Sequence, residues 1–242
     1  MKHPLDIFQK IYVINLASRQ DRRREMCDQL SRIGLSPEAG KAEFFDAVRP
    51  EVAGDFPSIG SRGCFLSHLG VLKDASARGF QTVLILEDDL NFVDTFRQRM
   101  AAIGERLRER DWSIFYGGYR VDRTPAPDGL DCAAISSDEG VGTTHFVGVQ
   151  GEVIPSLVRY LEAQLARPRG HPEGGPMHVD GAYCWFRRAH PEFITLLAVP
   201  QLGYQRVSRT DVHDLKWYDS TVGIRLAVSL VRRLRAGRQG GN

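Results

Sequence analysis

Residues 82–89 read TVLILEDD, and this stretch decides the fold. Its first five residues carry no charge and are rich in β-branched and aliphatic side chains, as in strands that a parallel sheet buries on both faces. Residues 11–16, IYVINL, repeat the pattern. Two such strands, alternating with segments of helical spacing, predict an α/β domain with a mostly parallel central sheet flanked by helices.

Further elements follow from the spacing of apolar residues and from glycine and proline. Helices are expected over residues 18–33, 61–79 and 153–165, the second capped by Ser61. Strands are expected at residues 112–116, stopped by Gly117 and Gly118, and at residues 143–149. Residues 123–140 lack periodicity and predict an exposed excursion, and residues 168–176 predict a flexible loop.

The composition limits the class of protein. The chain has 242 residues, 42% of them hydrophobic, and a formal net charge of +2, which shows no bulk attraction to nucleic acid. The four cysteines form no C-x-x-C pair, so we expect reduced thiols in a cytosolic protein. The first residues lack the apolar stretch of a signal peptide, and no run of eighteen apolar residues occurs. A cytoplasmic protein, soluble or peripheral on a membrane, is expected.

Three adjacent carboxylates, Glu87, Asp88 and Asp89, follow the strand directly. Like charges at a strand end repel one another unless a cation binds them, and ligands of open α/β sheets sit at this end of the strands. Hard oxygen ligands favour Mg²⁺ or Mn²⁺. Strand alternation would direct Glu87 and Asp89 to the metal and Asp88 to hydroxyls of the substrate. Such a metal suits the departure of a diphosphate. The alternative is a solvated turn whose acids cap the next helix.

Four ordered motifs resemble glycosyltransferase family 25, which includes bacterial lipooligosaccharide and animal collagen galactosyltransferases. They are IYVINL at residues 11–16, Arg19 with DRR at residues 21–23, GCFLSH at residues 63–68, and LEDD at residues 86–89. The resemblance implies a GT-A type, Rossmann-like fold, a UDP-galactose-type donor, Mn²⁺ and inversion at the anomeric carbon. It also implies a role in lipopolysaccharide biosynthesis or a related surface glycan.

Carried over to this chain, the resemblance places Asn15, Leu16 and Arg19 near the donor's uridine and phosphates, with Arg22 as a further candidate. It places Ser67 and His68 on a helix beside the donor site, in a binding or positioning role, and Asp88 is the donor-binding candidate by its direction on the strand. A loop that opens a helix favours anions there. The arginines have an alternative role as the solvated face of an amphipathic helix. A single helical histidine such as His68 is by default a structural hydrogen-bonding residue.

Inverting transfer needs a base for the acceptor hydroxyl, separate from the metal cluster. Asp180, in HVDGAY at residues 178–183, is the first choice, resembling the family's late Pro-Val-Asp segment. Its alternative role is to cap a helix that starts near Gly181. Asp211 and His213 are further candidates for the metal, alongside Glu87 and Asp89, because both are metal-competent and lie two residues apart. A plain surface loop is the alternative for that segment.

The domain is expected to span residues 1–222, followed by a basic amphipathic helix and tail over residues 223–242. Apolar residues Ile224, Ala227, Val228, Val231 and Leu234 fall on one helical face, with arginines on the remainder. Such a helix would bind an anionic membrane surface, and packing against the domain or a partner is an equal alternative.

These features together predict a glycosyltransferase that moves a hexose, galactose first, from a UDP-sugar to a hydroxyl of a lipooligosaccharide or other surface glycan. Two alternatives stay open. One is a metal-dependent nucleotidyltransferase or phosphohydrolase that uses the same carboxylates. The other is a non-catalytic module that binds sugar nucleotides.

Overall fold

The computed structural model describes residues 3–36, 40–109, 111–127 and 131–206. In chain order the elements are η1 (Pro4–Ile7), β1 (Lys10–Asn15), α1 (Gln20–Arg32), β2 (Ala42–Asp46), α2 (Ile59–Ala77), β3 (Thr82–Glu87), β4 (Leu90–Phe92), α3 (Phe96–Glu109), β5 (Ile114–Arg120), β6 (Cys132–Ile135), β7 (Gly142–Gln150), α4 (Ile154–Ala166), α5 (Val179–Ala189), β8 (Thr195–Ala198) and β9 (Gly203–Gln205). Asp211, His213 and the helix expected over residues 223–242 lie outside the described residues, so those predictions stay predictions.

The central sheet has seven strands in the order β2-β1-β3-β7-β5-β8-β6, and β4 pairs with β9 in a separate two-stranded ribbon. Strands β1, β2, β3, β5 and β8 run in one direction, while β7 and β6 are antiparallel to their neighbours. The predicted fold class, an α/β domain with a mostly parallel sheet flanked by helices, is confirmed.

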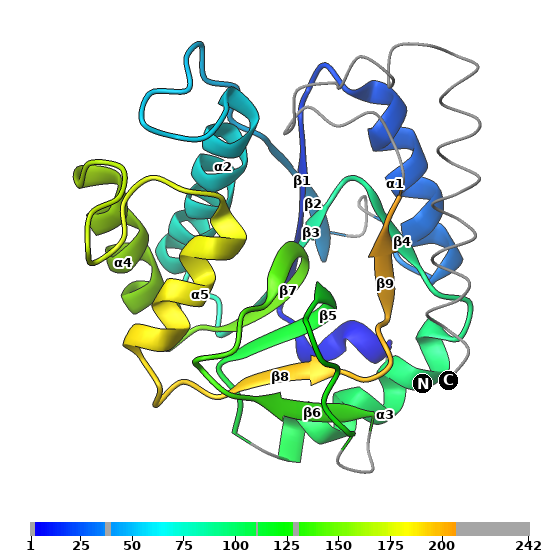
Figure 1. Ribbon diagram of the computed structural model, residues 1–242. Coiled ribbons are helices and arrows are strands. Elements are labelled where there is room, and N and C mark those ends of the chain that lie inside the picture. Colours follow the sequence, from blue (N-terminus) through cyan, green and yellow to red (C-terminus); the bar gives the residue numbers. More distant parts are fainter. Residues whose placement is uncertain (1–2, 37–39, 110, 128–130, 207–242) are drawn as a thin grey trace, which may run out of the picture. The chain divides into compact units, whose positions relative to one another are not determined.

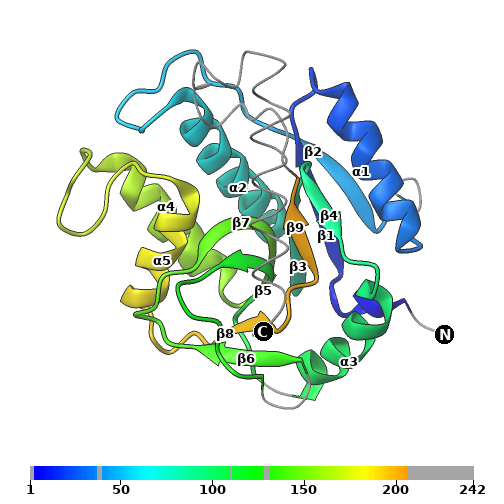
Figure 2. The same ribbon diagram turned by 45° about the vertical axis from the view of Figure 1, so that its right-hand side comes forward.

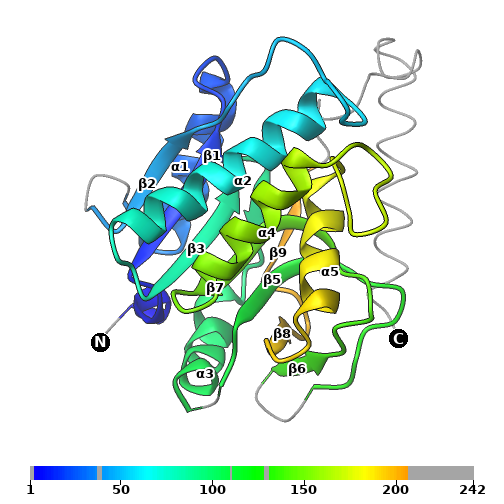
Figure 3. The same ribbon diagram turned by 90° about the vertical axis from the view of Figure 1, so that its left-hand side faces the viewer.

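Helices cover both faces of the sheet (Figure 1). Helices α2, α4 and α5 lie side by side over one face (Figure 3), and α1 and α3 lie over the other (Figure 2). Alternate residues of β1 separate into two cores, Tyr12 and Ile14 facing α2 and Ile11 and Val13 facing α1. Burial on both faces explains why this strand reads as one continuous apolar run.

Three segments differ from the sequence expectations. Strand β5 continues through Gly117 and Gly118, because the neighbouring strand β7 supplies its hydrogen-bond partners in spite of the glycines. Residues 123–140 are not wholly an excursion, since they contain β6, which pairs with β8 at the edge of the sheet. Helix α2 begins earlier than expected, with Ser58 as N-cap and Ser61 as its reciprocal partner in a capping box.

Glycines in the central strands make room for aromatic rings. A Cβ atom added to Gly117 would lie 2.6 Å from the ring of Phe146, and one added to Gly148 would lie 2.6 Å from the ring of Phe8. Both distances are far below van der Waals contact, so each ring occupies the space that a side chain would need. The glycines are therefore part of how the two cores are filled.

Among the described residues, no helix is long and apolar enough to cross a membrane.

Candidate functional site

The candidate site lies where β1 and β3 end and β7 begins. Ile14 pairs with Glu87 in the parallel register, so Asn15 and the acidic cluster come together at one edge of the sheet. Leu86 pairs with Phe146 in the antiparallel register, which brings Thr144 and His145 beside the same cluster. Three sequence segments therefore converge at the carboxyl end of β3, where open α/β sheets hold their ligands.

Asp88 is buried and its charge is already matched. Its Oδ1 accepts a hydrogen bond from Nη1 of Arg22 at 2.8 Å, and its Oδ2 accepts one from Nδ2 of Asn15 at 2.7 Å. The side chains of Arg22 and Asp88 are each only 9% exposed. Two of the predicted donor-binding residues thus hold a third in place, and the pair ties α1 to the end of β3.

Asp89 is the carboxylate without a close cation. Its Oδ1 is buried and has no hydrogen-bond partner, and its Oδ2 lies 4.0 Å from Nη1 of Arg22. Burial, together with the nearby charge of Glu87, raises the pKa of Asp89 to about 7. A bound cation would offset the repulsion between the carboxylates and would supply the partner that Oδ1 of Asp89 lacks.

Glu87 contacts residues of α2 and β7. Its Oε1 accepts a hydrogen bond from Oγ1 of Thr144 at 2.8 Å and lies 3.3 Å from Nε2 of His68. Burial favours the neutral acid, but the bond and charge of His68, with His145 and Thr144, outweigh it and hold the pKa of Glu87 below its ordinary value. Glu87 is therefore an anion held by neutral or basic partners.

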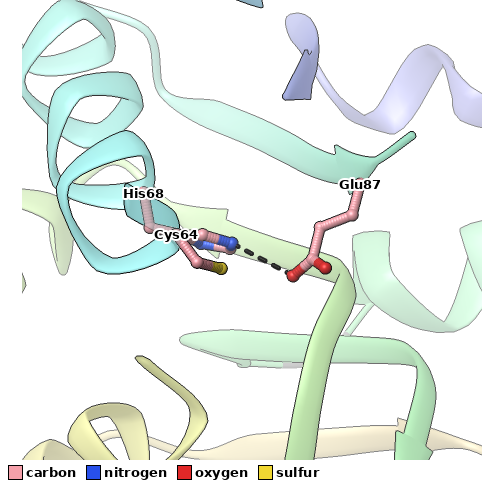
Figure 4. Close-up of side chains that lie close together, drawn as sticks. All are labelled: Cys64, His68 and Glu87. Carbon is pink, nitrogen blue, oxygen red and sulfur yellow. Dashed lines mark hydrogen bonds and ion pairs between the residues drawn. The ribbon is translucent and has the colours of Figure 1, made fainter. Parts of the chain in front are cut away.

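Cys64 completes a compact group with His68 and Glu87 (Figure 4). One ligand atom from each of the three lies within 4.8 Å of the others. Burial raises the pKa of the Cys64 thiol well above its usual range, and the charges of Glu87, Asp180, Asp89 and Asp88 add to the effect. This is the one group of three potential metal ligands among the described residues, and it differs from the predicted set.

Asp180 lies in the first turn of α5 rather than at its N-cap, which is His178. Its Oδ2 accepts a hydrogen bond from the backbone N–H of Thr143 at 3.1 Å, and its Oδ1 accepts one from Gly181 N–H at 2.8 Å. Its charge acts on Cys64 together with that of Glu87. The structure thus places Asp180 on a separate element from the acidic cluster, with its carboxylate oriented by backbone donors.

The remaining predicted residues differ in their exposure. The side chain of Arg19 is 21% exposed and pairs with Asp21 at 2.8 Å, and Leu16 is half-buried in the turn before it. Ser67 is fully buried, donates a hydrogen bond to Gly63 O at 2.7 Å and accepts one from Val48 N–H at 2.8 Å. The bond from Val48 N–H ties α2 to the chain that precedes it, whereas the bond to Gly63 O lies within the helix.

Arg206 is a site residue that the sequence did not reveal. Its backbone N–H donates to Asp89 O at 2.7 Å, and its Nη2 lies 3.0 Å from a carboxylate oxygen of Glu25. Its charge lowers the pKa of Asp89, although burial and Glu87 prevail. In sequence it belongs to a stretch rich in arginine and serine that resembles a surface loop, and only the pairing of β9 with β4 brings it to the cluster.

A comparison with protein families fits this geometry. Residues 51–123 match the model described as glycosyltransferase family 25 (LPS biosynthesis protein). The resemblance to glycosyltransferase family 25 is confirmed. The matched segment contains α2 with the GCFLSH motif and β3 with the acidic cluster, so the family likeness coincides with the site.

Curated relatives of this family align with about half of the chain. The mouse protein "Inactive glycosyltransferase 25 family member 3" is 28% identical over 129 residues, 46% of this chain and 22% of that protein. Zebrafish (Danio rerio) "Procollagen galactosyltransferase 1" is 25% identical over 146 residues, 50% of this chain and 23% of that protein. The Aedes aegypti "Glycosyltransferase 25 family member" is 31% identical over 130 residues, 45% and 21% of the two chains. The chain thus spans about a quarter of the length of these relatives.

Among solved structures, a glycosyltransferase involved in glycosylation of the major capsid of PBCV-1 aligns with 83% of this chain and 93% of its own, with a TM-score of 0.39 and 10% identity.

Proposed function

We propose that this protein is a glycosyltransferase that moves a hexose, galactose first, from a UDP-sugar to a hydroxyl of a surface glycan or lipid-linked oligosaccharide, with inversion. The observation that carries the proposal is the state of Asp89. A buried, unpartnered carboxylate oxygen stands at the carboxyl end of β3. It lies within the segment that matches the family.

The residues present fit the divalent cation that the resemblance implies. Asp89 would hold it through Oδ1, and Glu87 would support it through Oε2, the oxygen that does not face His68 and Thr144. Asp88 would not bind the cation, because Arg22 and Asn15 already occupy both of its oxygens. When bound, such a cation stabilises negative charge on the departing diphosphate. Mn²⁺ and Mg²⁺ are the expected ions.

The chain's own side chains would divide the remaining work. Arg19, partly exposed at the start of α1, would contact the donor phosphates. Asp180 would accept the proton of the acceptor hydroxyl, because its carboxylate lies outside the acidic cluster and is oriented by two backbone N–H groups. The expected cytoplasmic location and membrane contact rest on the sequence alone.

A second candidate is a non-catalytic module that binds sugar nucleotides. It is favoured by one observation, that the mouse and human relatives carry the word "Inactive" in their names. The reaction alternative, nucleotidyl transfer or phosphate hydrolysis, would use the same carboxylates. The identity of the released nucleotide separates these functions, since glycosyl transfer releases UDP.

The test is a nucleotide-release assay with UDP-galactose, Mn²⁺ and a galactosyl acceptor panel. We expect UDP release by the unaltered chain and a loss of about 10²-fold or more in Asp89→Asn. Asp94→Asn is the matched control, because this side chain is 94% exposed and pairs only at the surface with Arg32. Release of UMP with galactose 1-phosphate would indicate hydrolysis, and release of galactose 1-phosphate without UMP would indicate nucleotidyl transfer. UDP binding by calorimetry without turnover would indicate the binding module.

A further inference from the structure

Cys64 and His68 present two metal-binding atoms on one face of α2. They are four residues apart in the helix, so their side chains lie one above the other. Both point toward Glu87 at the end of β3 (Figure 4). The cluster therefore joins a helix and a strand, and Asp89 is not one of its members.

The spacing of these atoms fits a tetrahedral zinc ion. In such a site, Zn–N and Zn–O distances near 2.1 Å place a nitrogen and an oxygen ligand about 3.4 Å apart. Nε2 of His68 and Oε1 of Glu87 lie 3.3 Å apart. The Cys64 sulfur is within 4.8 Å of both, against about 3.6 Å expected for sulfur and nitrogen around zinc. A side-chain rotation of Cys64 would close that difference.

Both non-sulfur ligands are oriented by neighbouring hydroxyls, as metal ligands commonly are. The Tyr183 hydroxyl lies 3.5 Å from Nδ1 of His68, which leaves Nε2 directed at the cluster. Thr144 donates its hydroxyl hydrogen to Oε1 of Glu87 at 2.8 Å. The aromatic ring of Tyr183 also packs edge-on against His68, which restricts rotation of the imidazole.

The donor set selects a different metal from the one in the proposed function. A thiolate, an imidazole and a carboxylate suit zinc, whereas Mg²⁺ and Mn²⁺ prefer oxygen ligands throughout. Three protein ligands leave the fourth tetrahedral position for water or another small ligand. Cys64 and Glu87 are half-buried while His68 is fully buried, so the metal can enter from the side of the thiol and carboxylate.

From this arrangement we propose that Cys64, His68 and Glu87 form a zinc site that ties α2 to the end of β3. It does not depend on the proposed glycosyl transfer, because it concerns metal binding in the absence of any nucleotide. Glu87 can serve both sites, since Oε1 faces His68 and Thr144 and the carboxylate has a second oxygen, Oε2.

The test measures zinc bound by the full, untagged chain. After apo-protein is titrated with Zn²⁺ and dialysed, we expect one zinc per chain by elemental analysis. The Cys64→Ser and His68→Gln variants should bind more than about 100-fold more weakly, and Tyr183→Phe about 10- to 100-fold more weakly. Cys27→Ser is the matched control, another half-buried helical cysteine, and it should bind as the unaltered chain does.

Substitution by Co²⁺ gives an independent readout on the unaltered chain. Tetrahedral cobalt bound by Cys64 should show thiolate-to-metal charge transfer, which Cys64→Ser abolishes and Cys27→Ser retains. Absence of bound zinc, or zinc binding that Cys64→Ser leaves unchanged, would overturn the proposal. Should Cys64→Ser not fold, as judged by circular dichroism, the cobalt spectrum of the unaltered chain decides, and lack of the charge-transfer band refutes the site.

Discussion

Replacement of Arg22 by methionine would leave the buried Asp88 without its cation. Arg22 contacts Asp88 at 2.8 Å, and both side chains are 9% exposed. Among the described residues, the side-chain hydrogen bond to Asp88 that would remain comes from the neutral Asn15. Removing one partner of a buried ion pair costs about 3–5 kcal/mol, because the other charge stays desolvated. We therefore expect Arg22→Met to lower the free energy of unfolding by about that amount, a large part of a typical domain's stability.

Urea unfolding followed by circular dichroism measures this loss, and two further variants test its cause. Arg32→Met removes an exposed pair with Asp94 and should cost no more than about 1 kcal/mol. The double variant Arg22→Met/Asp88→Asn removes the uncompensated charge as well. It should regain about 1.5 kcal/mol or more relative to Arg22→Met alone. A loss below about 1 kcal/mol in Arg22→Met, or strictly additive losses in the double variant, would refute the reasoning.

Three more substitutions test other features of the site. Folding raises the pKa of Asp89 from 3.8 to about 7, so as pH rises the carboxyl group loses its proton in the unfolded chain before it does in the folded chain. In metal-free buffer the contribution of Asp89 to the free energy of unfolding therefore falls as pH rises between these two values. Asp89→Asn should remove this fall. The free energy of unfolding of the variant, measured by urea titration and compared with that of the unaltered chain, should therefore increase from pH 4 to pH 7 by about 4 kcal/mol at most. If the two free energies of unfolding changed with pH in the same way, this prediction would be contradicted. Ser67→Ala leaves the Val48 N–H without its acceptor and should lower the unfolding free energy by about 1–2 kcal/mol, and an unchanged urea midpoint would show that water replaces the hydroxyl. A Cβ at Gly118 would lie 2.3 Å from Nε2 of His145, so Gly118→Ala should destabilise the domain by about 1–3 kcal/mol, whereas Gly140→Ala, with no atom within 4 Å of the added carbon, should not; equal melting temperatures of the two variants would disprove the close packing.

The sequence predicted the parts of the fold that depend on local patterns. Residues 83–86 of the expected strand are buried, and α4 starts one residue from the predicted position. Strands β6 and β8 have only four residues each and escape such patterns, because β8 is held by pairing with β5 and β6, and β6 by pairing with β8 at the sheet edge. The antiparallel direction of β7 could also not be predicted from the sequence, because the direction of a strand depends on the connections that precede and follow it.

The candidate site shows the same limit. The position of the acids after β3 was evident from sequence, but the division of their roles was not. Arg22 and Asp88 are 66 residues apart, and their contact depends on how α1 packs beside the sheet. The spacing of Cys64 and His68 is visible in the sequence, yet their approach to Glu87 requires α2 to lie along β3. Contacts between residues far apart in sequence therefore give the three adjacent carboxylates three different environments.

The filling of glycine positions by aromatic rings has a consequence for how this domain diverges. The ring of Phe146 fills the space that a side chain at Gly117 would need, and the ring of Phe8 does the same at Gly148. A larger residue at either glycine would be accommodated only where the facing ring has become smaller, so the members of each pair should change together among relatives. Because this coupling arises from packing and not from catalysis, it should persist in descendants that have lost their acidic cluster, and it would trace their common ancestry after the chemistry has gone.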